Sequence, residues 1–185
     1  MGLEAILLGL VSTPQSGYDL KKEFENSLAH FWSVNLSQIY PTLKKMEIKG
    51  LVASRSSESH LGPSKVIYER TPEGRDALLR WLTSGPVFKA EKLHHLAQAY
   101  FLYELDNKKL ASDFFEKLLA ELKAWQVQME SIDSLWRGSY DETFFEALPK
   151  EDFYPYLTLD LGLRKNLTMI AWCQDCLRHI SKRKE

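Results

Sequence analysis

Three side chains near the C-terminus have types and spacing that could serve metal or redox chemistry. Cys173, Cys176 and His179 follow one another at three-residue steps. A structural zinc site takes four ligands, usually from two elements, whereas this run supplies three from one predicted helix. Because a cysteine inside a helix is more often a small buried hydrophobe, we predict no metal site. A metal- or redox-responsive sensor that uses Cys173 and Cys176 is kept as an alternative.

The sequence contains no signature of an enzyme. His94 and His95 are adjacent, so on a helix their side chains diverge by about 100° and cannot share a metal ion. The chain has no nucleophile elbow, P-loop, dinucleotide-binding fingerprint or zinc-protease motif. We therefore predict a protein that is not an enzyme and that needs no cofactor.

A different chemistry, recognition of DNA, is indicated by the polar side of the segment 33–52. At about 100° per residue, one side of a helix here gathers polar and basic residues. Glutamine can pair with adenine and serine can bond either kind of base edge, so we predict base contacts for Ser37 and Gln38. Lys44 and Lys45 are predicted to contact phosphate, which adds affinity without sequence information. A solvated surface helix would show the same pattern, so this alternative stays open on the segment alone.

The opposite side of the same segment is apolar and needs a core. Its residues recur at helical spacing: Leu36, Ile39, Leu43 and Met46. Asn35 precedes them and can cap the helix, with Gln38 three residues later as the reciprocal partner. Asn35 is therefore a DNA-binding candidate whose favoured role is capping, and Gln38 has the same alternative. Gly50 ends the helix.

The segments around this helix have the order of a winged helix-turn-helix. Amphipathic helices are predicted at 3–10 and 18–31, and strands at 51–57 and 65–70, with a polar, turn-rich tip between the strands. In this motif the third helix enters a major groove, and the hairpin tip lies along the backbone or in the adjacent minor groove. Tyr18 and Lys65 are then further candidates for backbone contacts.

A domain boundary is predicted at the turn formers Ser-Gly-Pro, residues 84–86. They end a helix that begins at 71–73, where a threonine cap, a proline in the first helical position and an acidic residue follow one another. We predict a winged helix-turn-helix domain at 1–85 and a helical domain at 86–185. The fold is therefore mainly α with a small β-hairpin.

Long helices fill the second half of the chain. From 118 to 136 the apolar residues step alternately by four and three, which is coiled-coil spacing, and a last helix starts near Asp152. Two long helices without a sheet make a poor domain alone, so we predict an arm that packs against the same arm of a second chain. The residues predicted to form this dimer interface are Leu118, Leu122, Trp125, Met129, Ile132, Leu163, Leu167, Ile170 and Leu177. A helical hairpin within one chain is the alternative.

The composition is that of an ordinary soluble protein, with 44% of the 185 residues hydrophobic, 26% charged and a net charge of −1. Net charge therefore gives no global signature of nucleic-acid binding. Between 33 and 70, however, there are six basic and three acidic residues, whereas 86–185 holds 14 basic and 16 acidic ones. The positive charge is local, as expected for a phosphate-facing surface.

The sequence predicts a reducing, cytoplasmic setting without a membrane. The apolar run at 5–11 is too short to span a bilayer, and it has neither a basic flank nor a small-residue cleavage site. Two cysteines do not make a disulfide scaffold.

The first 85 residues resemble the PadR family of bacterial transcriptional regulators. The resemblance runs through I-L-L-G-L-V-S at 6–12, S-G-Y-D-L-K-K-E-F at 16–24, H-F-W at 30–32, S-Q-I-Y-P-T-L-K-K-M-E at 37–47, K-G-L-V at 49–52 and T-P-E-G-R at 71–75. The second half is similar, in its helix layout, to the extended, virulence-activator-like C-terminal domain of some family members.

This resemblance implies a homodimer that binds a near-palindromic operator in double-stranded DNA and usually represses transcription. In some members, phenolic acids or other small molecules release the DNA. The resemblance also favours phosphate contact by the Tyr40 hydroxyl over simple core packing. Family wings often carry a basic residue where this chain has Ser64, followed by Lys65, so a weaker wing contact is implied.

We therefore predict a dimeric repressor whose two reading helices occlude a promoter. A ligand that changed the spacing of these helices would release the DNA, because both must fit half-sites about one turn apart. A small aromatic effector could bind among the rings of Trp81, Tyr100, Trp125, Trp136 and Trp172, although core packing is the other use of these rings. The rival function is a winged-helix protein–protein adaptor that does not bind DNA.

Overall fold

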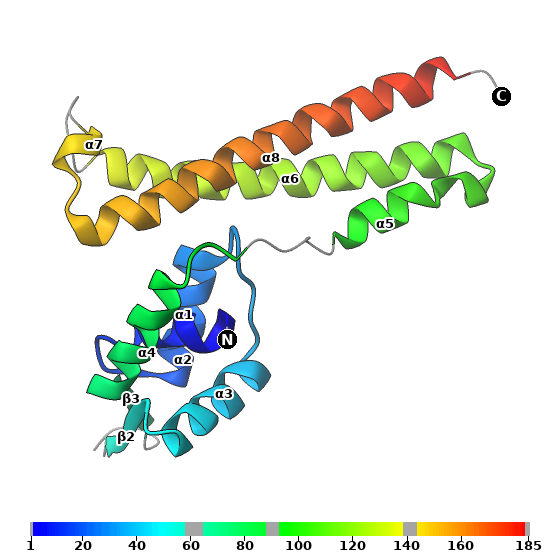
Figure 1. The fold of residues 1–185 in the computed structure, drawn as a ribbon. Coiled ribbons are helices and arrows are strands. Elements are labelled where there is room, and N and C mark those ends of the chain that lie inside the picture. Colours follow the sequence, from blue (N-terminus) through cyan, green and yellow to red (C-terminus); the bar gives the residue numbers. More distant parts are fainter. Residues whose placement is uncertain (1, 58–64, 88–92, 139–143, 184–185) are drawn as a thin grey trace. The chain divides into compact units, whose positions relative to one another are not determined.

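Two compact units make up the chain, Met1–Lys89 and Ala90–Glu185. The computed structural model in Figure 1 describes residues 2–57, 65–87, 93–138 and 144–183. Most of the predicted hairpin tip, with Ser64, lies outside the described residues. Within the described ranges, no helix is long and apolar enough to cross a membrane.

The N-terminal unit contains the three predicted helices, with one change in the second. They are α1 (Gly2–Leu10), α2 (Gly17–Glu23) and α3 (Leu36–Ile48). The prediction of one α-helix over 18–31 was wrong in its second half, because after Glu23 the chain forms a π-helical turn, η1 (Phe24–Leu28). Such turns are rare, and the apolar spacing here is that of an ordinary helix.

The predicted β-hairpin is confirmed as β2 (Val52–Ser57) and β3 (Lys65–Arg70), which pair antiparallel. A third strand that the sequence did not predict, β1 (Gln15–Ser16), adds to the other edge of β3 and gives the order β1-β3-β2. The predicted helix after the hairpin is α4 (Pro72–Thr83). Its start is confirmed, because the Gly74 N–H donates to the Thr71 hydroxyl at 3.0 Å.

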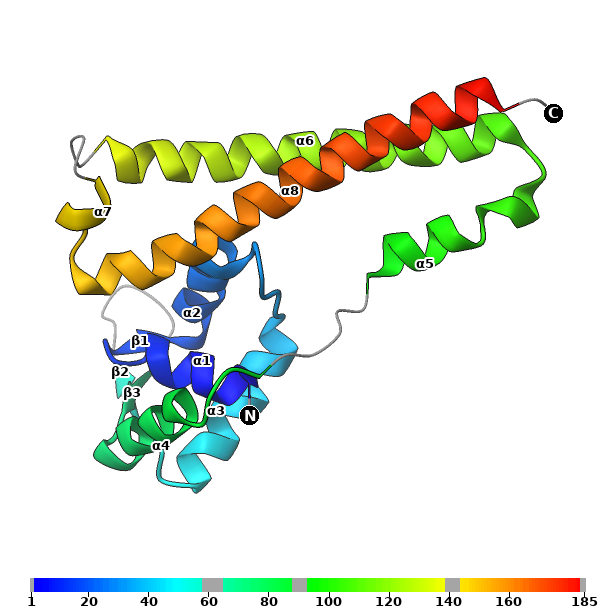
Figure 2. The same cartoon turned by 45° about the horizontal axis from the view of Figure 1, so that its top comes forward.

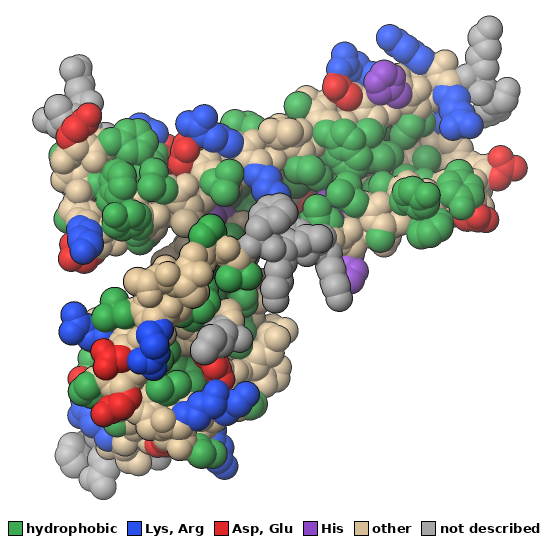
Figure 3. Space-filling model, viewed as in Figure 1, with side chains coloured by type: hydrophobic (Ala, Val, Ile, Leu, Met, Phe, Trp, Pro, Cys, Tyr) green, Lys and Arg blue, Asp and Glu red, His purple; other side chains and the backbone are tan. Residues whose placement is uncertain are grey.

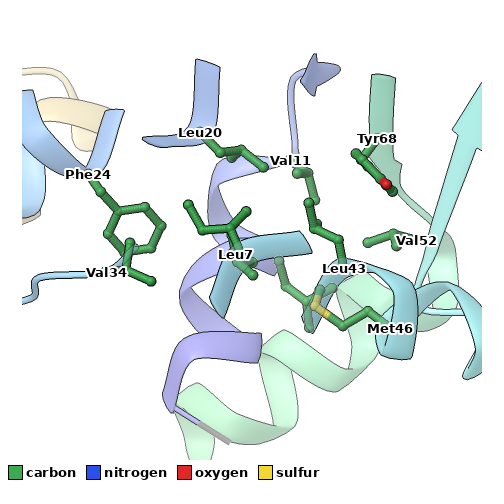
Figure 4. Close-up of a cluster of buried hydrophobic side chains, with 11 residues drawn as sticks. Leu7, Val11, Leu20, Phe24, Val34, Leu43, Met46, Val52 and Tyr68 are labelled. Atoms are coloured by element: carbon green, nitrogen blue, oxygen red, sulfur yellow. The ribbon is translucent and has the colours of Figure 1, made fainter. Parts of the chain in front are cut away.

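One hydrophobic core joins the elements of this unit (Figure 4). Its buried side chains come from α1, α2, η1, α3, β2 and β3, from Val11 directly after α1, and from the segment before α3. Ile39, Leu43 and Met46 of α3 have no exposed surface. Because these three residues fix the rotation of α3 about its own axis, they also fix which side chains of α3 face solvent.

The C-terminal unit is a helical hairpin with smaller helices at its ends. Its elements are α5 (His94–Tyr100), the 3-10 turn η2 (Leu102–Leu105), α6 (Lys108–Arg137), α7 (Phe144–Ala147) and α8 (Lys150–Lys182). Figures 1 and 2 both show α6 and α8 side by side and antiparallel. The sequence therefore predicted the long helices correctly.

A buried cluster near the α7 end of the hairpin joins α6 to α8. Tyr156 of α8 has no exposed surface, and its hydroxyl donates to Asp133 Oδ1 at 2.6 Å and accepts from Arg137 Nη2 at 2.6 Å. Burial and the neighbouring Asp133 carboxylate raise the pKa of Tyr156 to about 12. This cluster ties the end of α6 to the beginning of α8.

Four of the nine predicted dimer residues pack inside the same hairpin. Trp125, Met129, Ile132 and Leu163 pack in the cluster around Tyr156, so the intrachain hairpin that the sequence left as an alternative is present. By contrast, Leu167 is exposed, and Leu118, Leu122, Ile170 and Leu177 are half-buried. Contact of the nine residues with a second chain stays a prediction.

A candidate nucleic-acid interface

The outer side of α3 is polar, basic and open to solvent. Ser37, Gln38, Lys44 and Lys45 are all exposed. They lie opposite the buried stripe of α3. The helix cannot rotate about its axis without exposing core side chains. The structure thus gathers the four residues predicted for base and phosphate contact on one accessible surface.

The N-terminus of α3 shows that Gln38 takes part in a cap. The Asn35 N–H donates to Gln38 Oε1 at 3.1 Å, which is the Gln38 half of the reciprocal cap expected from the sequence. Pairing with adenine needs the amide of glutamine both to accept and to donate. The bond from Asn35 uses one of the two lone pairs of Gln38 Oε1. The Gln38 amide can therefore still accept one bond and donate through Nε2, as pairing with adenine requires.

Tyr40 joins α3 to the beginning of α2. A Cβ atom on Gly17 would lie 2.5 Å from Tyr40 Cε1, so the ring packs directly on the Gly17 backbone. The Tyr40 side chain is still 45% exposed. Its ring can therefore pack while its hydroxyl stays available for a phosphate, and the phosphate contact stays a prediction.

Basic side chains gather where α2 begins. A hydrogen bond from Ser16 holds the pKa of Asp19 below its usual value, and the positive charges of Lys65 and Lys22 lower it further. The Lys22 ammonium also lies 4.9 Å from the centre of the exposed Tyr18 ring. Pairing of β1 with β3 brings Lys65, the first residue of β3 after the hairpin tip, to this place. Lys22 was not among the residues predicted for DNA contact, although its i,i+4 spacing from Tyr18 indicated the contact.

Lys45 is also close to an acidic residue, Glu4, which no sequence pattern had indicated. Glu4 of α1 lies 3.0 Å from Lys49 Nζ and 3.7 Å from Lys45 Nζ. The hydrogen bond from Lys49 and the positive charges of Lys49 and Lys45 hold the pKa of Glu4 below its usual value. Lys44, by contrast, is in no ion pair within the described part of the chain. Glu4 therefore competes with any phosphate for Lys45.

Replacing Glu4 with glutamine is expected to tighten DNA binding. The change releases Lys45 and Lys49 and removes a negative charge next to the surface that is predicted to face phosphate. Because exposed ion pairs contribute about 0.2–1 kcal/mol, we expect roughly two- to fivefold higher affinity at low salt. Fluorescence anisotropy with a labelled operator measures this affinity. The matched control is Glu73→Gln on α4, which also removes one negative charge. Unchanged or weaker binding would mean that Glu4 positions the lysines instead.

The cysteines lie in α8 as packed thiols. Cys173 is buried and Cys176 is half-buried, and burial raises the pKa of both. A raised pKa disfavours the thiolate that metal binding and redox exchange require. Among the described residues, no three His, Cys, Asp or Glu side chains form a group that could hold a metal ion. These observations do not favour the metal- or redox-sensor alternative.

The aromatic rings proposed for an effector are partly used in packing. Trp125 and Trp136 pack against the cluster around Tyr156. The Trp172 ring contacts Phe115 edge-on, with 5.5 Å between ring centres. Tyr100 is 74% exposed. Core packing therefore accounts for three of the five rings.

The three-helix fold with its wing, and the basic outer side of α3, define a winged helix-turn-helix DNA-binding regulator with a helical C-terminal unit. Two family models agree with this class. The model of the transcriptional regulator PadR-like family matches residues 6–80, and that of the virulence activator alpha C-terminal domain matches residues 94–181.

Known proteins give the same result over the whole length. The chain is 31% identical to the negative transcriptional regulator PadR of Bacillus subtilis over 97% of this chain and 98% of that protein. It is similar to the crystal structure of B. subtilis PadR in complex with operator DNA, with a TM-score of 0.78, 29% identity and coverage of 97% and 99% of the two chains. The structure of that protein with p-coumaric acid matches with a TM-score of 0.71, 29% identity and coverage of 98% and 96%. The chain belongs to the PadR-like family of transcriptional regulators.

Proposed function

We propose that this protein represses transcription in the cytoplasm, as a dimer that reads operator DNA with α3 and carries out no enzymatic reaction. The observation that carries the proposal is the exposed outer side of α3 opposite a fully buried stripe. Ser37 and Gln38 would contact bases, whereas Lys44 and Lys45 would contact phosphates. The complex of the B. subtilis relative with operator DNA supports this assignment.

Tyr18, Tyr40 and Lys65 extend the proposed surface to the backbone beside the groove. Tyr18 lies at the start of α2, and Tyr40 of α3 packs there on Gly17; Lys65 and Lys22 add positive charge. Asn35 is proposed mainly as the N-cap residue of α3, where the Gln38 side chain accepts from its N–H. One such surface makes few contacts, so specific binding needs two copies on the two half-sites of a near-palindrome.

The dimer is supported by apolar side chains that the C-terminal unit leaves exposed. Figure 3 shows hydrophobic side chains gathered on one face of this unit. Tyr100 and Tyr103 near α5, Val127 of α6 and Leu161 of α8 are among the exposed ones. Exposed apolar surface on this scale is typical of an interaction site. A second copy would cover it together with the predicted Leu167, and sedimentation equilibrium measures the resulting mass.

Release of DNA by a small aromatic effector is also proposed. The B. subtilis relative has been crystallised with p-coumaric acid, and an analogous flat acid is the first ligand to test. Release would follow if the acid changed the spacing of the two α3 helices. Titration of the acid into the protein–operator complex, followed by anisotropy, measures it.

Lys44→Ala tests the DNA-binding proposal against a protein–protein adaptor. Operator fragments are first selected from a random DNA pool with the wild-type protein. Loss of one phosphate contact should weaken binding to all fragments roughly uniformly. It should also reduce the slope of log affinity against log salt concentration by about one. Lys123→Ala on α6 is the control. If no fragment is enriched and Lys44→Ala changes nothing, the adaptor is the better explanation.

A further inference from the structure

The outer side of α3 carries two apolar side chains among its polar ones. Pro41 is exposed, and Ile48 is 80% exposed although it belongs to a helix whose other side is fully buried. Within the described N-terminal unit, Ile48 lies outside the core cluster. Core packing therefore does not explain why an isoleucine occupies this position.

Helix geometry places the two residues in one line. Seven residues are almost two full turns, so Pro41 and Ile48 point in nearly the same direction, about 10 Å apart along the axis. That distance corresponds to roughly three base-pair steps of 3.4 Å. Lys44 and Lys45 lie between them in sequence and are exposed on the same surface. The outer side of α3 thus carries two aligned apolar side chains with two lysines beside them.

The major groove offers a matching pattern. Thymine presents a 5-methyl group on the groove floor, where apolar side chains contact it, whereas phosphates line the groove edges. An apolar line with lysines beside it complements methyl groups between phosphate rows. A protein partner would supply apolar surface as well, but the lysines favour a polyanion.

We propose that Pro41 and Ile48 read the 5-methyl groups of thymines in the operator. The inference rests on the proposed function, because it requires α3 to lie in the major groove. It adds two specificity-determining residues that make no hydrogen bond to a base. Ile48 is the better probe, since an 80% exposed side chain can be shortened without a cost to the core.

The test replaces single thymines of the selected operator by deoxyuridine, which keeps base pairing and lacks only the methyl group. Wild-type protein should lose about three- to fivefold in affinity at each contacted position of a half-site. Ile48→Ala should become insensitive at one of these positions and keep its sensitivity at the other. Leu79→Ala, which shortens an exposed leucine on α4, should keep the complete wild-type profile. Circular dichroism checks that both variants are folded.

The possible failures are distinguishable. If wild-type protein binds the operator but every deoxyuridine substitution leaves the affinity unchanged, the methyl contacts do not exist. If Ile48→Ala keeps the full wild-type profile, Ile48 makes no methyl contact and the assignment is overturned. If wild-type protein enriches no sequence at all, the proposed function itself fails and this inference falls with it.

Discussion

Replacing Gly74 with alanine is expected to cost the N-terminal unit about 3 kcal/mol of stability or more and to abolish operator binding. Gly74 lies in the first turn of α4, where a Cβ atom would be 2.0 Å from the Leu51 carbonyl oxygen and 3.0 Å from Leu8 Cδ2. The first of these neighbours is backbone, so no side-chain rotation can relieve the contact. α4 would have to move away from the turn that joins α3 to β2.

That movement would affect α3, the proposed DNA-reading helix, directly. The Thr71 N–H donates to the Leu51 oxygen at 3.2 Å, and the Thr71 hydroxyl donates to the Gly50 oxygen at 2.7 Å. Gly50 has a φ of +71°, so the turn between α3 and the wing depends on a left-handed glycine. Displacing α4 removes both bonds, and the orientation of α3 relative to β2 is then no longer fixed.

Gly9→Ala is the matched control for this prediction. Gly9 is also in a helix, but a Cβ atom there would meet nothing within 4 Å. Alanine should therefore stabilise α1 by about 0.5–1 kcal/mol. Urea denaturation followed by circular dichroism measures both variants, and operator anisotropy measures binding. Equal stability of the two variants would contradict the role assigned to Gly74.

Local signals were sufficient for most of the helices and strands and for the exposed side of α3. The cap of α3 by Asn35 and Gln38, the start of α4 at Thr71 and the two strands of the wing are each encoded within a few neighbouring residues. Capping and turn chemistry act over such distances. The apolar stripe of α3 then determined which side chains face outward.

Contacts between distant segments could not be predicted in this way. Glu4 meets Lys45 and Lys49 across more than 40 residues, and β1 meets β3 across about 50. Neither contact leaves a periodic pattern in the sequence. The close approach of Gly74 to Leu51 is likewise invisible, because the sequence does not say which backbone a helix will touch. These tertiary contacts set the electrostatics and rigidity of the surface.

The apolar stripe of α6 shows a different limit. Coiled-coil spacing indicates that a helix packs against another helix, but it does not show whether that helix belongs to the same chain or to a second one. In the structure, Met129 is covered by α8 of its own chain. The hairpin also contains a polar pair that apolar periodicity cannot predict. Asn166 of α8 and Gln126 of α6 are both buried.

Replacing Asn166 with leucine is expected to lower the free energy of unfolding of the C-terminal unit by about 2–3 kcal/mol. Asn166 Nδ2 donates to Gln126 Oε1 at 2.8 Å and to the Leu122 oxygen at 2.9 Å, while Gln126 Nε2 donates to Glu130 at 2.9 Å. Leucine would leave the buried Gln126 oxygen without its donor. Urea denaturation of the full chain, followed by amide exchange in α6 and α8, measures the loss.

The double variant Gln126→Leu with Asn166→Leu separates pairing from packing. With both polar groups removed, nothing buried is left unpaired, and stability should return to within about 1 kcal/mol of wild type. If instead the double variant loses as much stability as the two single variants together, the two amides act independently of each other. A recovered double variant whose α6–α8 amides exchange faster would show that the pair fixes the register of the hairpin, as single buried polar residues do in coiled coils. Because the proposed dimer surface spans both helices, a slip in register would also misalign the two reading helices, and operator binding would fall although the unit is stable.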